Sequence, residues 1–334
     1  MNEARYSRQM LFKHIGSNGQ EKIMNAHVLI VGMGALGTHL AEGLARAGVG
    51  ELTIVDRDYI EYSNLQRQTM FTEMDAQERL PKVIAAERNL MAIRQDLKLN
   101  PYIEHVDRLF LETYAQDVQL ILDATDNFET RQLVNDFAYK ATIPWIYGGV
   151  VQSTYVEATF IPDKTPCFNC LMPQLPVINM TCDTVGVIQP AVTMTTSLQL
   201  RDALKILIGE ATTPKLTYGD IWEGTHFTFG FSKLYNASCP TCGSQPTYPH
   251  LNATERQFAS LCGRDTVQYE NSDISQEMLE TFLIHQAIPY KRNPYMLHFE
   301  YKKHRIVSFK GGRMLIHGMT KPQQAINLIN QLFG

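Results

Sequence analysis

The sequence lacks three features that would each point to a particular class of protein. No apolar run approaches the roughly 20 residues that a bilayer-spanning helix needs. Residues 1–5 contain no apolar core of the secretory type. Positive charge is not in excess, because 30 lysines and arginines are outweighed by 34 acids, giving a net charge of -4 and no broad basic field. We therefore expect a cytoplasmic protein whose partners include neither a membrane nor nucleic acid.

Internal repeats, low-complexity tracts and charge blocks are also missing. A chain of 334 residues is too long for one small core and suits one large domain or two. Its apolar fraction of 44% and charged fraction of 19% are ordinary for a globular protein, so we expect a packed core.

Strand patterns alternate with helix patterns along the first half of the chain. In order, they fall at about 28–32, 35–47, 51–55, 81–93, 120–124, 129–140 and 143–147. This alternation predicts a doubly wound, mostly parallel, Rossmann-like α/β sheet. Segments 151–161 and 216–235 predict antiparallel strands that extend the sheet, and 191–208 predicts a long helix.

A shift in composition near 243–253 predicts a domain boundary. We expect an ATP-binding domain over 1–250, which also contains two cysteine pairs, and a small C-terminal α+β module over 254–334. The elements expected in the module are strands at 297–301 and 305–309, a tight turn at 311–312 and a helix at 321–333.

Three glycines follow the first apolar run and suit a loop that binds phosphate. Gly32 lets the chain turn sharply out of the strand, Gly34 leaves room for a phosphate, and Gly37 lets the next helix pack close to the sheet. The helix N-terminus that they open favours an anion through its free N–H groups and its dipole. Asp56 ends the next strand, where a carboxylate can accept ribose hydroxyls. The pattern predicts a nucleotide site, with a ligand-free glycine turn as the alternative.

The polar residues downstream of that aspartate favour a triphosphate over a dinucleotide such as NAD. Arg67 stands beside the amide Gln68, and a guanidinium matches phosphate oxygens in a forked geometry. Lys82, at the start of the next predicted helix, can add a point charge. Asp58 and Asn64 complete the group. Each of them could instead be an ordinary surface residue, and NAD remains the alternative ligand.

Asp126 follows the strand predicted at 120–124, outside its carboxyl end, where open α/β sheets bind ligands. Because Mg²⁺ prefers one or two carboxylates together with phosphate oxygens, Asp126 is a candidate metal ligand. The alternative is that it caps the N-terminus of the helix that follows, a role that aspartate fills well.

Four of the six cysteines form two C-x-x-C pairs. They are Cys167, Cys170, Cys239 and Cys242. Two such pairs satisfy a closed, tetrahedral, structural zinc site. Residues 171–238 separate the pairs, so the fold would have to bring them together. A redox pair or inert buried thiols are the alternatives, and for Cys262, in the C-terminal module, we expect a core thiol.

Several motifs occur together, in the order in which one known family has them. They are Arg5-Tyr6-Ser7-Arg8-Gln9, the glycine loop 32–37, Ser63-Asn64-Leu65-Gln66-Arg67-Gln68, and Asp123-Ala124-Thr125-Asp126-Asn127. In this combination the chain resembles the ubiquitin-activating-type adenylyltransferases, and within them the bacterial MoeB and ThiF enzymes, over about residues 5–243.

The resemblance implies roles for these residues. It implies that Asp56 holds the ribose, that Asn64, Arg67 and Lys82 line the phosphates, and that Asp126 binds Mg²⁺ or steers the triphosphate. It also implies a split zinc site made by the two cysteine pairs. The nucleotide ligands expected are Gly32, Gly34, Gly37, Asp56, Asp58, Asn64, Arg67, Gln68, Lys82 and Asp126; the catalytic residues expected are Arg8, Asn64, Arg67, Lys82, Asp126 and Cys182.

Two of these expectations depend on the resemblance alone. Arg8 resembles an arginine that the partner subunit supplies across a homodimer interface. Cys182 is similar in position to a cysteine that ThiF-like enzymes carry near the carrier's terminus, where a thiolate could form a covalent link in sulfur transfer. An inert loop cysteine is the alternative for Cys182.

The activity implied is ATP-dependent adenylation of a protein C-terminus. The substrate would be a small β-grasp sulfur carrier ending in Gly-Gly. We expect a MoaD-like carrier of molybdopterin biosynthesis, with ThiS of thiazole biosynthesis as the alternative, and a sulfur donor such as a cysteine desulfurase. An NAD-dependent oxidoreductase and a non-catalytic partner-binding protein are the alternatives from other classes.

Overall fold

The computed structural model describes residues 3–174, 185–210, 215–253, 258–260, 265–271 and 273–333. The chain divides into two compact units, Met1–Ala253 and Thr254–Gly334, each described by itself below. Cys182 and Cys262 lie outside the described residues.

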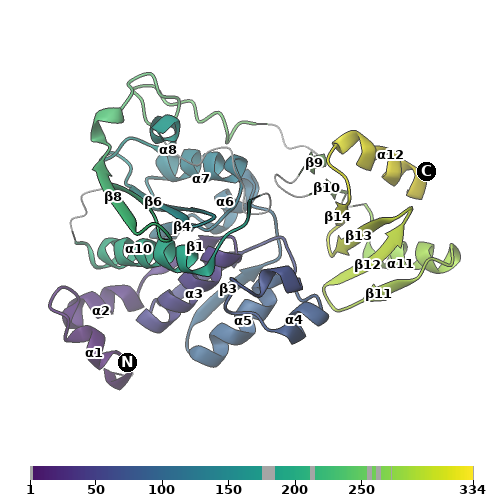
Figure 1. Cartoon of the computed structure of the whole chain (residues 1–334), viewed down its shortest axis with the longest axis horizontal. Coiled ribbons are helices and arrows are strands. Elements are labelled where there is room, and N and C mark those ends of the chain that lie inside the picture. The colour runs from purple at the N-terminus through teal and green to yellow at the C-terminus, as the bar shows by residue number, and fades with distance from the viewer. Residues whose placement is uncertain are drawn as a thin grey trace. The chain divides into compact units, whose positions relative to one another are not determined.

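The first unit is built on one eight-stranded sheet (Figure 1). In spatial order its strands are β3 (Lys98–Tyr102), β2 (Glu51–Val55), β1 (His27–Val31), β4 (Leu120–Asp123), β5 (Trp145–Val151), β6 (Thr154–Phe160), β7 (Lys215–Asp220) and β8 (Thr225–Gly230). The pairs from β3 to β5 are parallel and those from β5 to β8 are antiparallel. This architecture confirms the predicted doubly wound sheet with an antiparallel extension.

Helices cover both faces of this sheet. The core on one face includes side chains of α2 (Gly16–Met24), α3 (Ala35–Ala47), α4 (Glu73–Gln77), α5 (Lys82–Ile93) and α10 (Gln189–Ile208). The core on the other face includes side chains of α6 (Arg108–Tyr114), α7 (Phe128–Ala141) and α8 (Phe168–Leu171). The short helix α1 (Glu3–Met10) contacts α2. The central strands β1 and β4 are buried by the two layers, so their apolar runs follow from burial on both sides.

Helix ends follow the local sequence. Gly48 and Gly209 close α3 and α10 in the left-handed conformation, with φ of +99° and +78°. This conformation favours glycine, which is why those helices end where the sequence predicted. Pro81 directly precedes α5, where its missing N–H leaves no helical hydrogen bond unmade.

Two strands differ from the sequence prediction. β5 continues beyond the expected short strand at 143–147 to Val151, because its second half pairs with β6. β3 was not predicted, since it is a half-exposed edge strand that includes Lys98, Asn100 and Pro101 and has no apolar run.

The second unit is an antiparallel sheet with two helices. Its strand order is β11 (Tyr290–Arg292), β12 (Met296–Tyr301), β13 (His304–Phe309), β14 (Arg313–His317), β10 (Thr266–Glu270) and β9 (Phe258–Ser260), with α11 (Gln276–His285) and α12 (Pro322–Phe333). Gly311 and Gly312, with φ of +89° and +84°, form the tight turn between β13 and β14. The unit is the small α+β module that the sequence predicted. Among the described residues, no helix combines the length and apolarity needed to cross a bilayer.

Candidate active site

The order of the parallel strands creates one topological switch point. From β1 the chain moves outward to β2 and β3, and then crosses to β4 on the other side of β1. Open α/β sheets bind ligands at such a point, outside the carboxyl ends of the strands. Here the loops after β1 and β4 adjoin, because a Cβ on Gly32 would lie only 2.7 Å from the carbonyl oxygen of Ala124.

The glycine loop after β1 opens the N-terminus of α3. Gly32 has φ of +97°, and a side chain on Gly37 would collide with the Gly32 carbonyl. Gly34 is different, because an added Cβ would meet only the Nε2 atom of Gln68, at 3.8 Å. The loop is therefore tight where it packs on the sheet and open at Gly34, as a phosphate-binding loop requires.

Asp56, at the end of β2, is held by backbone and faces a buried lysine. Its carboxylate accepts hydrogen bonds from Met33 N and Asp58 N, both at 2.7 Å. The Nζ of Lys82 lies 3.9 Å from Asp56 and 3.4 Å from Asp58. Burial raises the pKa of Asp56, and the Lys82 charge opposes that rise. A cation and two carboxylates thus meet beside the glycine loop.

The segment after β2 contributes three further polar side chains. Asn64 ends the short helix η1 (Tyr62–Asn64), and its Oδ1 accepts from the backbone N–H of Glu61 at 3.0 Å. Arg67 donates to the Ser63 carbonyl at 2.9 Å. Gln68 is 3% exposed, and within the described part of the chain its buried Oε1 has no hydrogen-bond partner. Of these three side chains, only Gln68 is close to the glycine loop by a stated distance, the 3.8 Å between its Nε2 and a Cβ added to Gly34.

The loop between β4 and α7 carries Asp126 at the surface. The N-cap of α7 is its neighbour Asn127, whose Oδ1 accepts from Thr130 N at 2.9 Å. The alternative interpretation of Asp126 as the helix cap is therefore wrong, and its carboxylate lies beside the cap.

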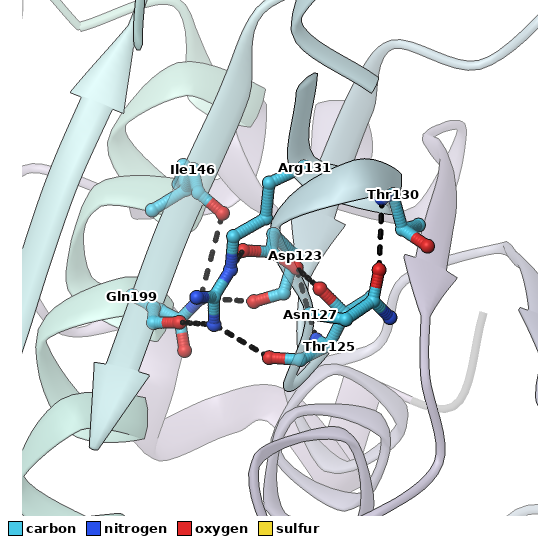
Figure 2. A network of polar contacts seen from close by, with 8 residues as sticks. Asp123, Thr125, Asn127, Thr130, Arg131, Ile146 and Gln199 are labelled. Atoms are coloured by element: carbon cyan, nitrogen blue, oxygen red, sulfur yellow. Dashed lines mark hydrogen bonds and ion pairs between the residues drawn. The ribbon is translucent and has the colours of Figure 1, made fainter. Parts of the chain in front are cut away.

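A buried ion pair behind that loop was not predicted (Figure 2). Arg131, from α7, donates from Nε to Asp123 at 3.0 Å, and its Nη2 donates to the carbonyls of Thr125 and Gly148 at 2.6 and 3.2 Å. Gln199, from α10, donates to the Asp123 carbonyl at 2.9 Å. One signal in the sequence pointed to such a pair: an aspartate that ends a buried apolar strand needs a partner.

The remaining predicted residues are not placed at this edge. Arg8 lies on α1 with an exposed side chain, and among the described residues no hydrogen bond or ion pair joins it to the other site residues. Cys182 cannot be placed, because it lies outside the described residues.

The fold brings the two cysteine pairs together. The ligand atoms of Cys167, Cys170, Cys239 and Cys242 all lie within 4.8 Å of one another. Cys167 Sγ lies 3.5 Å from Cys239 Sγ, and Cys170 Sγ lies 3.6 Å from Cys242 Sγ. Burial raises the pKa of the Cys170 thiol to about 11, so a cation is needed to favour its thiolate at neutral pH.

Helix α7 anchors both cysteine segments. Asn135 accepts from Phe168 N at 2.9 Å, beside the first pair. Asp136 accepts from Thr241 Oγ1, within the second pair, at 2.5 Å, and Thr241 in turn accepts from Asn169 at 2.9 Å. The cluster is thus set by a rigid helix, which is how a closed metal site is held in shape.

Comparisons with known proteins place the chain in a family. The model of the ThiF family matches residues 6–241. The chain is 41% identical over 334 residues to the sulfur carrier protein ThiS adenylyltransferase of Bacillus subtilis, and the match covers 99% of each. It is 33% identical over 243 residues to the molybdopterin-synthase adenylyltransferase of Salmonella typhimurium, covering 72% of this chain and 96% of the relative. This chain belongs to the ThiF family, as its motifs indicated.

A solved structure agrees on the fold. The structure of Escherichia coli MccB with succinimide matches with a TM-score of 0.63 at 23% identity, covering 73% of this chain and 75% of that chain. At that identity the likeness concerns the fold alone.

Proposed function

We propose that this protein is an adenylyltransferase that activates the C-terminal carboxylate of a small sulfur carrier protein with ATP. The observation that carries the proposal is the likeness to a ThiS adenylyltransferase over essentially the whole chain. In the reaction a carboxylate oxygen bonds to the α-phosphorus of ATP, and the bond to the bridging oxygen breaks. Pyrophosphate leaves with the electron pair, and the carrier is left as an acyl-adenylate.

The ligand edge of the first unit can supply the catalysis by positioning and by charge. ATP would lie over Gly34, with Asp56 accepting the ribose hydroxyls and the Lys82 ammonium facing the phosphates. Arg67 and Asn64 would line the outer phosphates. No nucleophile of the protein is needed for adenylation, because the carrier brings its own.

Asp126 is our candidate ligand for Mg²⁺. It is exposed beyond the end of β4, and Asn127 rather than Asp126 caps α7. A carboxylate together with phosphate oxygens is the donor set that Mg²⁺ prefers. When bound, the ion neutralises charge on the triphosphate. Asp126, which follows β4, would hold the ion, whereas Asp56 follows β2 on the other side of β1.

The cysteine cluster fits a structural zinc ion. Four thiols within 4.8 Å of one another fill a tetrahedral shell and leave no position open for chemistry. Reduced thiols of this kind suit a cytoplasmic protein. Cys239→Ser should therefore lose bound zinc, measured by elemental analysis, and should lower the midpoint of thermal unfolding. Full zinc content in that variant would exclude the site.

The full-length match favours ThiS as the carrier over MoaD. The relative named for molybdopterin synthase aligns with only 72% of this chain although it is itself covered to 96%, so the match stops short of this chain's full length. The ThiS-named relative of Bacillus subtilis covers 99% of both chains. Because the ThiS-named relative of Escherichia coli also aligns with only 73% of this chain, coverage alone does not separate the carriers, and the choice of ThiS rests on the 41% identity of the full-length match. The C-terminal module, which includes Cys262, would then have a role that is specific to relatives matching over the full length of this chain.

Two further parts of the proposal concern partners. Arg8, exposed on α1, is available to enter the site of a second subunit in a homodimer. A sulfur donor such as a cysteine desulfurase would consume the acyl-adenylate, with Cys182 as the thiol that could link to the carrier.

Carrier-dependent exchange of labelled pyrophosphate into ATP tests the function. The protein would be incubated with ATP, Mg²⁺ and either purified ThiS or purified MoaD, with carriers lacking the last two glycines as matched controls. We expect exchange with ThiS, weaker exchange with MoaD and none with the truncated carriers. Absence of exchange with both intact carriers would contradict the enzyme assignment, and preference for MoaD would reverse the choice of carrier. Nicotinamide binding would instead support the oxidoreductase alternative.

A further inference from the structure

The ladder between β4 and β5 ends a few residues before Asp126. The parallel pairing of β4 and β5 ends at Leu122 and Ile146, so the next residues of both strands are not joined to each other as a ladder. Arg131 fills that gap. Its guanidinium joins the Asp123 carboxylate on β4 to the Gly148 carbonyl on β5. It also binds the Thr125 carbonyl, as Figure 2 shows.

The guanidinium is confined from several sides. Arg131 is 7% exposed, and its guanidinium carbon lies 4.9 Å from the ring centre of Tyr147 and 5.6 Å from that of Phe128. Below it, Gln199 occupies the space next to Gly148, where a Cβ would lie 2.6 Å from the Gln199 amide. An arginine in such a setting has one available geometry, so it can fix the atoms that it binds.

One of the groups that Arg131 binds, the Thr125 carbonyl, immediately precedes Asp126. Thr125 makes three hydrogen bonds. Its carbonyl accepts from Arg131, and its N–H and hydroxyl donate to Asp123 at 2.9 and 2.6 Å. On the other side of Asp126, Asn127 is fixed as the cap of α7. Both peptide neighbours of Asp126 are therefore held, while its own side chain stays at the surface.

We propose that Arg131 is a positioning residue, which holds the 124–127 loop so that the Asp126 carboxylate meets the metal–triphosphate complex in one orientation. The catalytic part of this inference rests on the proposed function. Displacing a catalytic group by about 1 Å can cost a factor of roughly 100 in rate, so a loop held at both ends has a direct consequence for turnover.

The alternative is that Arg131 only neutralises buried Asp123 and so contributes to stability. A variant that keeps the positive charge but lacks the planar guanidinium distinguishes the two roles. Arg131→Lys retains a cation for Asp123 and cannot reach three acceptors at once. Arg201→Lys is the matched control, because Arg201 on α10 binds its neighbour Asp202 at 2.7 and 2.8 Å and Glu157 of β6 at 3.5 Å, and makes no hydrogen bond or ion pair with residues 124–127.

Two measurements on the full-length protein test the proposal. The first is amide hydrogen exchange of peptides that include residues 124–127, with no ligand present. We expect Arg131→Lys to speed exchange there by roughly tenfold, and Arg201→Lys to leave it at the wild-type rate. The second is pyrophosphate exchange as a function of Mg²⁺ concentration. We expect Arg131→Lys to lower the saturated rate by roughly tenfold and to need several-fold more Mg²⁺, and Arg201→Lys to change neither.

The outcomes are distinguishable from failure of the proposed function. If Arg131→Lys fails to fold, Thr125→Val, which removes only the hydroxyl bond to Asp123, takes its place, with a smaller change expected in the same direction. Wild-type exchange rates in the loop, or an unchanged Mg²⁺ requirement beside an active wild type, would overturn the positioning role. An inactive wild type would contradict the proposed function alone, and the hydrogen-exchange arm would still decide whether Arg131 holds the loop.

Discussion

Two carboxylate–cation pairs lie at the ends of the strands that flank β1, and they are built differently. Asp56, which pairs with Lys82, directly follows β2, and Asp123, which pairs with Arg131, is the last residue of β4. Burial raises the pKa of both aspartates, and in both the neighbouring cation opposes that rise. In both sites, therefore, a buried carboxylate depends on a neighbouring cation for its charge.

The difference is in how completely each pair is satisfied. Arg131 binds a carboxylate and two carbonyls through a planar fork, at distances of 2.6 to 3.2 Å. Lys82 lies 3.4 and 3.9 Å from its two carboxylates, and Asp56 takes its short hydrogen bonds from backbone instead. The comparison indicates that the Asp123–Arg131 pair has a structural role, a frame that holds the end of β4. The Lys82 ammonium makes longer contacts and can also bind a ligand.

Removing the guanidinium should have the largest effect on stability. Arg131→Met leaves Asp123 buried without a neighbouring cation, so we expect the free energy of unfolding to fall by about 3–5 kcal/mol. Urea unfolding followed by circular dichroism measures this. A loss under about 1 kcal/mol would show that the pair is not the frame of the β4 edge.

The corresponding change on β2 should affect activity far more than stability. Lys82→Met should lower pyrophosphate exchange by about 100- to 1,000-fold, the effect of removing one group that stabilises charge in a transition state. Asp56 keeps both backbone hydrogen bonds, so we expect the free energy of unfolding to fall by only about 1 kcal/mol. If the stability losses of the Lys82 and Arg131 variants were equal, the distinction between frame and ligand site would be wrong.

A third acidic site, Glu157 on β6 with Asp202 and Arg201 on α10, tests how burial changes the pKa of a carboxyl group that shares one cation with a second carboxylate. Burial, and then the charge of Asp202, raise the pKa of Glu157 to about 8, and Arg201 is the cation that opposes the rise. Because this folded-state pKa lies above the ordinary glutamate value of 4.5, the stabilisation from protonated Glu157 is complete below about pH 4.5 and is lost as the pH rises through about 8. Glu157→Gln should remove that loss.

Urea unfolding at several pH values between about 5 and 8 measures the pH effect, as the difference between wild type and variant. We expect the difference to move steadily in favour of Glu157→Gln as the pH rises. A difference that is constant across the range would show that Glu157 is ionised throughout.

The smallest expected effect concerns the cap of the helix that carries Arg131. Asn127→Ala removes the acceptor for Thr130 N and should cost about 1 kcal/mol of stability. Asp126→Ala leaves the cap in place and should cost less, while pyrophosphate exchange is lost. Thermal unfolding of the two variants side by side measures the order, and the reverse order would assign the capping role to Asp126 after all.

The sequence predicted the elements whose patterns arise locally. The apolar runs of β1, β2 and β4, the helices α3 and α10 and their closing glycines lie within a residue or two of their predicted limits. These depend on burial and on backbone conformation, which neighbouring residues determine. The edge strand β3 and the second half of β5 could not be predicted, because their pairing partners lie elsewhere in the chain.

The candidate site divides in the same way. Gly32, Gly37 and Asp56 were predicted from their places around two strands, since a tight turn and a strand end impose their residue types locally. Arg131 and Gln199 were missed, because one reaches across from a helix and the other comes from a helix much later in the chain. Neither contact has a local pattern.

By itself, the sequence determined the doubly wound sheet, the open glycine loop and the two cysteine pairs, because each is encoded in the spacing of neighbouring residues. Only the tertiary structure decided that the cysteine pairs meet within 4.8 Å, that Gln199 of α10 binds the Asp123 carbonyl, and that Arg131 joins β4 to β5. The physical reason is that these depend on distances between segments remote in the chain, which packing of the whole sheet and its helices sets.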